Sequence, residues 1–197
     1  MRSLYFLTHA EVEIDPSVPV SDWPLSERGR ARHAALSPKL RGVTGIYCSS
    51  ERKAWDGAEI LSAALRIAPR IIETLGENDR SATGYLPREE FERNADAFFS
   101  RPDESVRGWE TARAAQTRIV AAIDGIVVTD RSDGDIVVVS HGGVGALLCA
   151  ALGGHDIDRK YNQPAGGGGH VMTVALPGMA TDCRWVPFET FRSEAAA

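Results

Sequence analysis

Two histidines occupy matching positions, each directly after an apolar run of the chain. His9 follows Leu-Tyr-Phe-Leu-Thr at residues 4–8, and His141 follows Ile-Val-Val-Val-Ser at residues 136–140. A neutral imidazole is a good nucleophile toward phosphorus and forms covalent intermediates. A second imidazole beside it can donate a hydrogen bond to phosphoryl oxygens. A lone histidine after a strand is more often structural, but two in matching positions predict a site that handles phosphate.

These apolar runs have the composition of buried strands, and a third strand predicted at residues 43–49 also ends in hydroxyl side chains, Ser49 and Ser50. In open α/β sheets, ligands bind outside the carboxyl ends of the strands. We therefore expect all three polar ends to meet in one crevice. Gly142 and Gly143 then lead into a helix whose N-terminal amides are suited to an anion.

Strands and helices alternate along the rest of the chain. The expected strands cover residues 4–8, 43–49, 70–74, 136–139, 170–176 and 183–186, and the expected helices cover residues 26–40, 51–65, 87–99, 110–128 and 143–152. This alternation predicts an α/β three-layer sandwich, with a mostly parallel central sheet flanked by helices. We expect one domain over residues 1–197, with a cap-like excursion at about residues 76–108. The glycines at residues 166–169 are expected to let the backbone pass close to another segment.

Composition narrows the environment and the partners. The formal net charge is −5 and no Lys/Arg block is present, so neither nucleic acid nor an anionic membrane is expected as a partner. The apolar run near the N-terminus is too short for a signal peptide or a membrane helix, which favours the cytoplasm. The three cysteines, an odd number and far apart, predict no disulfide framework. His33, on a helix among arginines and alanines, is expected to be exposed.

Four motifs in order resemble the histidine phosphatase superfamily, the phosphoglycerate mutase-like proteins. The first strand of that family ends in Arg-His-Gly-Glu, and Thr-His-Ala-Glu stands at residues 8–11. The family's Pro-Leu-Thr-x-x-Gly is similar to residues 24–29, and its Ser-Ser-Pro-x-x-Arg-Ala-x-x-Thr-Ala is similar to residues 48–58. Its Ser-His-Gly-Gly matches residues 140–143 outright. The resemblance extends from residue 3 to about residue 176 and implies a phosphoglycerate mutase-like fold.

The resemblance also implies roles for individual residues. His9 corresponds to the nucleophile that accepts the phosphoryl group, and His141 corresponds to the second pocket histidine. Glu77 matches the family's proton donor, which protonates the leaving oxygen and then activates water; considered without the resemblance, Glu77 is equally an exposed loop residue. Glu110 and Arg118 match a supporting segment. No metal and no organic cofactor is implied.

The chain departs from the family at both pocket arginines. The first falls on Thr8, which has no charge, and the second falls on Lys53, whose ammonium lacks the planar fork that binds phosphate in a bidentate manner. Arg52 and Arg80 are candidates to compensate, although each also fits an ordinary solvated arginine. The substrate-binding set expected from the sequence is therefore Thr8, Lys53, Arg52 and Arg80.

Two functions remain in competition. One is a phosphomonoester hydrolase that acts on a small phosphorylated molecule through a phosphohistidine, with a mutase as a less favoured variant. The other is a catalytically impaired relative that binds a phosphorylated ligand or a partner protein through the same pocket. The chain contains no GxSxG elbow and no GxGxxG, which argues against a serine hydrolase and a dinucleotide enzyme. No pattern in the sequence specifies the substrate or the oligomeric state.

Overall fold

The computed structural model describes residues 2–193. Within these residues, six strands form one sheet in the order β3-β2-β4-β1-β5-β6. The strands are β1 (Arg2–Thr8), β2 (Val43–Cys48), β3 (Pro69–Ile71), β4 (Asp135–Ser140), β5 (His170–Leu176) and β6 (Trp185–Pro187). The first four run parallel, whereas β5 is antiparallel to both β1 and β6. The predicted mostly parallel sheet is confirmed.

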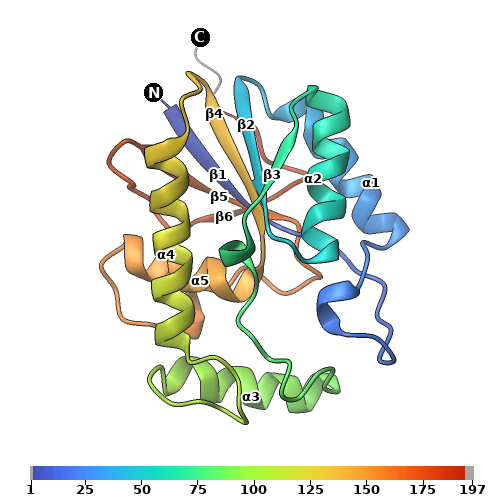
Figure 1. Ribbon diagram of the computed structural model, residues 1–197, viewed down its shortest axis with the longest axis vertical. Coiled ribbons are helices and arrows are strands. Elements are labelled where there is room, and N and C mark those ends of the chain that lie inside the picture. The colour runs from blue at the N-terminus through green and yellow to red at the C-terminus, as the bar shows by residue number, and fades with distance from the viewer. Residues whose placement is uncertain (1, 194–197) are drawn as a thin grey trace.

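Helices cover both faces of the sheet (Figure 1). The helices are α1 (Glu27–Leu36), α2 (Arg52–Leu65), α3 (Arg88–Ser100), α4 (Ala112–Thr129) and α5 (Gly142–Leu152). Helices α1 and α2 lie on one face and α4 and α5 on the other, while α3 lies across the carboxyl end of the strands. The predicted sandwich is therefore correct. No helix among residues 2–193 is long and apolar enough to cross a membrane.

The side chains of the central strands alternate between two cores. Leu4 and Phe6 of β1 pack with the α4 and α5 side, whereas Tyr5 and Leu7 pack with the α1 and α2 side. The same alternation holds along residues 136–139 of β4. Successive strand side chains point to opposite faces, so a continuous apolar run is needed where both faces are covered. The two runs that precede the histidines are thus fixed by burial on both sides.

Three element ends differ from the expectations. The helix expected to reach residue 40 ends at Leu36 and continues as a 3₁₀ turn at Ser37–Lys39, because Pro38 lacks the N–H that a further α-helical turn requires. The strand expected at residues 70–74 stops at Ile71 and is followed by the 3₁₀ turn Glu73–Leu75. The last strand, expected at residues 183–186, begins at Trp185 instead.

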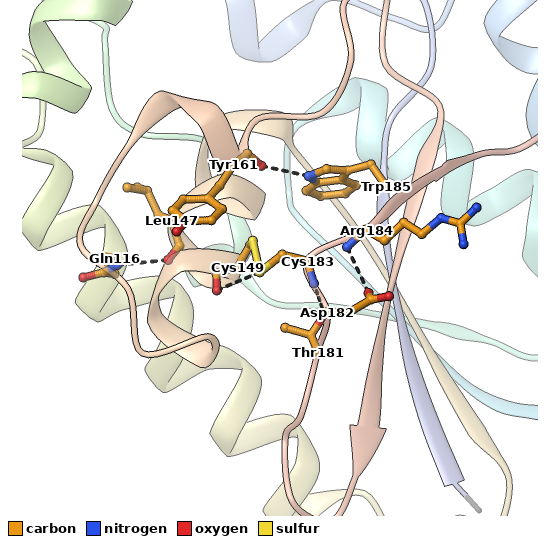
Figure 2. The surroundings of a disulfide bond; sticks show 9 residues. All are labelled: Gln116, Leu147, Cys149, Tyr161, Thr181, Asp182, Cys183, Arg184 and Trp185. Atoms are coloured by element: carbon orange, nitrogen blue, oxygen red, sulfur yellow. Dashed lines mark hydrogen bonds between the residues drawn. A yellow bond between two sulfur atoms is a disulfide. The ribbon is translucent and has the colours of Figure 1, made fainter.

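The prediction that the cysteines form no disulfide is wrong. Cys149 of α5 is bonded to Cys183, with 5.3 Å between the two Cα atoms, and Cys48 is a buried free thiol (Figure 2). The pairing was hidden because the two cysteines are 34 residues apart. They meet because the segment between β5 and β6, which contains Cys183, returns to α5. Nearby, the Trp185 indole N–H donates to the Tyr161 carbonyl at 2.8 Å and fixes the same region.

Candidate active site

The two histidines lie side by side, as predicted. Strands β1 and β4 are adjacent and parallel, and their register places Thr8 opposite Ser140. The residue after each strand end is then His9 or His141, and the centres of their rings are 5.2 Å apart. The His9 amide donates to the Ser140 carbonyl at 3.0 Å, so the strand pairing extends into the site. Strand register therefore sets the distance between the two imidazoles.

One hydrogen bond determines which nitrogen of His9 is free. His9 Nδ1 lies 2.9 Å from the Ala10 carbonyl oxygen. A carbonyl only accepts, so Nδ1 carries the proton, and Nε2 of the neutral ring keeps its lone pair. Burial, followed by the positive charge of Lys53, lowers the pKa of His9 to about 4. The ring is therefore neutral over the ordinary pH range, the form in which Nε2 acts as a nucleophile.

The loop after His9 is held by a buried histidine. The Ala10 amide donates to His33 Nε2 at 3.3 Å, and His33 is fully buried in α1, so the expectation that it is exposed is wrong. The pattern of α1 misleads because the ring packs edge-on against Phe188, with ring centres 5.0 Å apart. Burial lowers the pKa of His33 to about 3, which keeps Nε2 an acceptor for the Ala10 amide.

The glycine run at residues 166–169 passes close to the backbone of His9, which confirms the close approach predicted from the sequence. The Gly169 amide donates to the His9 carbonyl at 3.0 Å. Gly168 has a φ of +79°, and a Cβ at this position would lie 2.0 Å from the same carbonyl oxygen. Glycine is required there both for its left-handed backbone and for the space.

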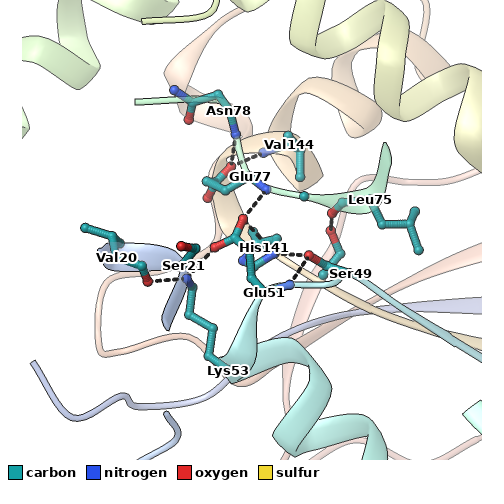
Figure 3. Close-up of polar contacts among 12 residues, drawn as sticks. Val20, Ser21, Ser49, Glu51, Lys53, Leu75, Glu77, Asn78, His141 and Val144 are labelled. Carbon is teal, nitrogen blue, oxygen red and sulfur yellow. Dashed lines mark hydrogen bonds and ion pairs between the residues drawn. The ribbon is translucent and has the colours of Figure 1, made fainter. Parts of the chain in front are cut away.

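His141 is completely buried behind His9. Its Nε2 is hydrogen-bonded to Ser49 Oγ at 2.9 Å, which brings in the polar end of β2 as expected (Figure 3). Its Nδ1 is buried and has no hydrogen-bond partner among the described residues. Burial lowers the pKa of His141 well below its usual value although the Glu51 carboxylate raises it. The ring is therefore neutral at ordinary pH.

Glu77 lies at the N-terminus of α5. Its carboxylate accepts from the Gly143 amide at 3.1 Å and from the Val144 amide at 3.0 Å. The anion expected at these amides is therefore a side chain of the protein itself. The segment is fixed by Arg118, which donates to the carbonyls of Gly76 at 2.9 Å and Glu77 at 3.1 Å.

Thr8 takes part in a neutral hydrogen-bond chain at the position of the family's first arginine. Thr8 Oγ1 donates to Gln163 Oε1 at 2.6 Å and accepts from the His170 amide at 3.1 Å. The imidazole of His170 also bonds to Gln163 Oε1, through Nδ1 at 3.2 Å. Thr8 is completely buried. Its hydroxyl is uncharged, so Thr8 supplies no positive charge at this position.

Lys53, at the position of the second arginine, is already paired. Its ammonium contacts the Glu51 carboxylate and donates to the Val20 carbonyl at 2.8 Å, and the residue is only 2% exposed. Sequence reasoning missed Glu51. The only signal for it was a carboxylate two residues before Lys53, directly after the predicted strand, and that spacing alone does not show that the two side chains meet.

The two arginines expected near the phosphate differ in position. Arg52 forms an ion pair with Asp56, with Nε 2.7 Å from Oδ1, and lines neither of the cavities described below. The structure thus separates Arg52 from Arg80, because Arg52 is paired with Asp56 and lines neither cavity. Arg80 lines both cavities, and its guanidinium carbon lies 4.9 Å from the centre of the Phe91 ring.

Two cavities open at the carboxyl end of the sheet. One of about 560 Å³ is lined by His9, Glu77 and Gln163 and extends under α3. The other, of about 660 Å³, is lined by residues 16–21 (except Ser17) together with Glu51. Glu77, Asn78 and Arg80 line both. Among residues 2–193, no group of three His, Cys, Asp or Glu side chains is arranged to hold a metal ion.

Comparison with known proteins agrees with this geometry. The fold is similar to that of YhfR from Bacillus stearothermophilus, with 26% identity, a TM-score of 0.76, and coverage of 92% of this chain and 94% of the other. It is also similar to mycobacterial glucosyl-3-phosphoglycerate phosphatase in complex with inorganic phosphate, with 25% identity, a TM-score of 0.71, and coverage of 89% and 90%. No curated protein matches the sequence. The family model of the histidine phosphatase superfamily (branch 1) matches residues 4–173, and the chain therefore belongs to this superfamily.

Proposed function

We propose that this protein is a phosphomonoester hydrolase that acts through a phosphohistidine at His9. The observation that carries the proposal is the hydrogen bond from His9 Nδ1 to the Ala10 carbonyl at 2.9 Å. It leaves the lone pair on Nε2 of a ring that lines the 560 Å³ cavity together with Glu77. Membership of the histidine phosphatase superfamily supports the same class of reaction.

In the first step, His9 Nε2 attacks phosphorus, a P–N bond forms, and the bond from phosphorus to the ester oxygen breaks. Glu77 gives its proton to the leaving oxygen, which departs as an alcohol. In the second step, water attacks phosphorus, Glu77 takes the proton of that water, and the P–N bond breaks. Inorganic phosphate leaves, and His9 and Glu77 return to their starting states. One carboxyl thus serves as acid and base in turn.

Other side chains contribute hydrogen bonds and charge. His141 would donate from Nδ1, the nitrogen that has no partner among the described residues, to a phosphoryl oxygen. For this donation, the neutral ring must carry its proton on Nδ1 and accept from the Ser49 hydroxyl at Nε2, where the two atoms are 2.9 Å apart. Arg80 is the arginine we propose as the charged contact, because it lines the cavity that contains His9.

The test is hydrolysis of a generic aryl phosphate by the wild type and by His9→Ala. We expect the rate to fall by about 10³-fold or more, the order of loss when a covalent nucleophile is removed. His155→Ala, a histidine that stacks on Tyr161 away from the cavities, should retain the wild-type rate. Rapid quenching should trap the phosphoryl group on His9. Equal rates in the wild type and His9→Ala would disprove the assignment.

A second candidate function is favoured by the charge distribution at the pocket. Thr8 is neutral and Lys53 is paired with Glu51, so neither arginine position supplies an unpaired positive charge. A protein that binds a phosphorylated ligand without turning it over has the same features. Stabilisation of the wild type by phosphate against heat, with no turnover of a broad phosphoester panel, would support this second function over the first.

A further inference from the structure

Glu51 is a carboxylate within the site that none of the four motifs requires. Its Oε2 contacts the Lys53 ammonium, and its Oε1 accepts from the Glu77 amide at 2.7 Å. The same Oε1 lies 3.4 Å from His141 Nε2 (Figure 3). The side chain is 16% exposed and lines the larger cavity. Glu51 is thus held in place among groups that belong to the reaction site.

The partners of Glu51 have the chemistry that a phosphoryl group needs. An ammonium and a backbone amide are donors that bind phosphoryl oxygens in proteins. Glu51 has one of each within contact, from Lys53 and from Glu77, and its two oxygens accept from them as two oxygens of a phosphate would. A phosphoryl group that is to use Lys53 must therefore compete with this carboxylate.

The charge of the site also disfavours a phosphoryl group beside Lys53. Lys53 and Glu51 together contribute no net charge, and both histidines are neutral at ordinary pH because burial lowers the pKa of each. Burial raises the pKa of Glu51, but the Lys53 ammonium and the hydrogen bond from the Glu77 amide favour the charged carboxylate, and the pKa lies below its usual value. In the free site the Glu51 carboxylate is therefore charged at any pH at which inorganic phosphate is a dianion, and like charges at contact distance in a partly buried site repel strongly.

We propose that Glu51 is a selectivity residue that weakens binding of dianionic phosphate by occupying Lys53 and by repelling the incoming charge. The inference rests on the proposed function, since it concerns the pocket beside His9. Its consequence is that free phosphate, which is the product of hydrolysis, binds weakly and leaves readily. Loss of the Glu51 charge should convert the site into a tighter phosphate site.

The experiment measures the Kd of inorganic phosphate by calorimetry in the full chain. Glu51→Gln keeps the size of the side chain and removes its charge, and we expect binding at least about tenfold tighter than in the wild type, as for the loss of one close like-charge contact. The KM for an aryl phosphate should fall in parallel. Glu51→Asp, which keeps the charge, should show no gain, and Glu59→Gln, on the exposed side of α2, should match the wild type.

A double variant tests the route of the effect. If Glu51 acts by occupying Lys53, the gain in Glu51→Gln must disappear in the combined Glu51→Gln and Lys53→Gln variant. Should Glu51→Gln fail to fold, Glu51→Ser removes the charge with a smaller side chain and must show the same gain. A folded charge-removed variant that binds phosphate no tighter than the wild type overturns the inference.

The outcomes separate this inference from the proposed function, because phosphate binding is measured without turnover. Tighter binding in Glu51→Gln with no hydrolysis by either protein supports the inference and contradicts the proposed function. Hydrolysis by the wild type, together with an unchanged phosphate Kd in Glu51→Gln, supports the proposed function and overturns the inference.

Discussion

Buried polar groups differ between the two ends of the central strands: the carboxylates at the amino end have protein donors, whereas some buried atoms at the carboxyl end have no partner among residues 2–193. At the amino end, Asp135 accepts from the Ser3 amide at 2.8 Å and from the Tyr5 hydroxyl at 2.9 Å. Asp130, beside it, accepts from Tyr47 at 2.7 Å and forms an ion pair with Arg2. Each of these carboxylates is buried, and each oxygen named here has a protein donor. Such groups stabilise the fold because their hydrogen bonds replace those to water.

At the carboxyl end, by contrast, buried polar atoms remain unpaired. Among residues 2–193, the buried side-chain atoms without a hydrogen-bond partner include His141 Nδ1 and Asn78 Nδ2, both at this end. An unpaired buried donor costs free energy, and native proteins retain few of them. Among residues 2–193, the carboxylate oxygens named at the amino end thus have protein donors, whereas at the carboxyl end His141 Nδ1 and Asn78 Nδ2 have no partner.

The largest expected effect concerns the carboxyl end. Glu77→Gln should lower kcat for an aryl phosphate by about 10²–10⁴-fold, since the variant cannot transfer a proton. The free energy of unfolding should change little, because the side-chain carbonyl of the introduced glutamine still accepts from an α5 amide. Steady-state kinetics and denaturant unfolding measure the two quantities. Glu73→Gln, on the neighbouring exposed turn, is the matched control. A variant that loses stability and keeps kcat would contradict the comparison.

The next largest effect concerns the amino end, where we expect a loss of stability without a loss of activity. Asp135→Ala leaves the Ser3 amide and the Tyr5 hydroxyl without their carboxylate acceptor. We expect a loss of about 3 kcal/mol in the free energy of unfolding, with kcat/KM unchanged at temperatures where the variant is folded. Urea titration followed by circular dichroism measures the loss, and Asp124→Ala on the exposed face of α4 serves as control. A fall in kcat/KM without destabilisation would refute it.

The smallest effect is a dependence of stability on pH. Burial alone would raise the pKa of Asp130, but hydrogen bonds from Ser132 and Tyr47 outweigh it and lower the pKa to about 2 from its ordinary value of 3.8. A lowered folded-state pKa means that the contribution of this carboxylate is complete above about pH 4 and is lost as the pH falls toward 2. Unfolding free energies of the wild type and Asp130→Asn should converge over this window. Curves that stay parallel between pH 5 and about pH 2 would contradict the prediction.

Much of the site could be predicted because strand ends are local features. The apolar runs before His9 and His141 are recognisable from residue type alone, and parallel strands place their carboxyl ends at one edge. The run at residues 166–169 was interpretable for a similar reason, since consecutive glycines have few uses other than close backbone approach. These predictions required no knowledge of which strands are adjacent.

Two of the wrong predictions, the exposed His33 and the absence of a disulfide, come from contact between segments distant in sequence. His33 is buried because Phe188 packs on it, and Cys149 meets Cys183 because β5 and β6 bring the chain back to α5. Arg52 and Lys53 are adjacent in sequence yet have different partners, since successive side chains of a helix point about 100° apart. Composition and spacing carry no information of this kind.

The sequence by itself therefore determined the sandwich, the placement of the two histidines at strand ends and the family, because hydrophobic periodicity and short motifs are recognisable from neighbouring residues. Only the tertiary structure decided the charge of the pocket. Three features depend on side-chain geometry across elements: the pairing of Lys53 with Glu51, the hydrogen-bond chain from Thr8 to Gln163 and His170, and the contact of Glu77 with the N-terminal amides of α5. Electrostatic energy varies with distance and burial, and both quantities exist only once the chain has folded.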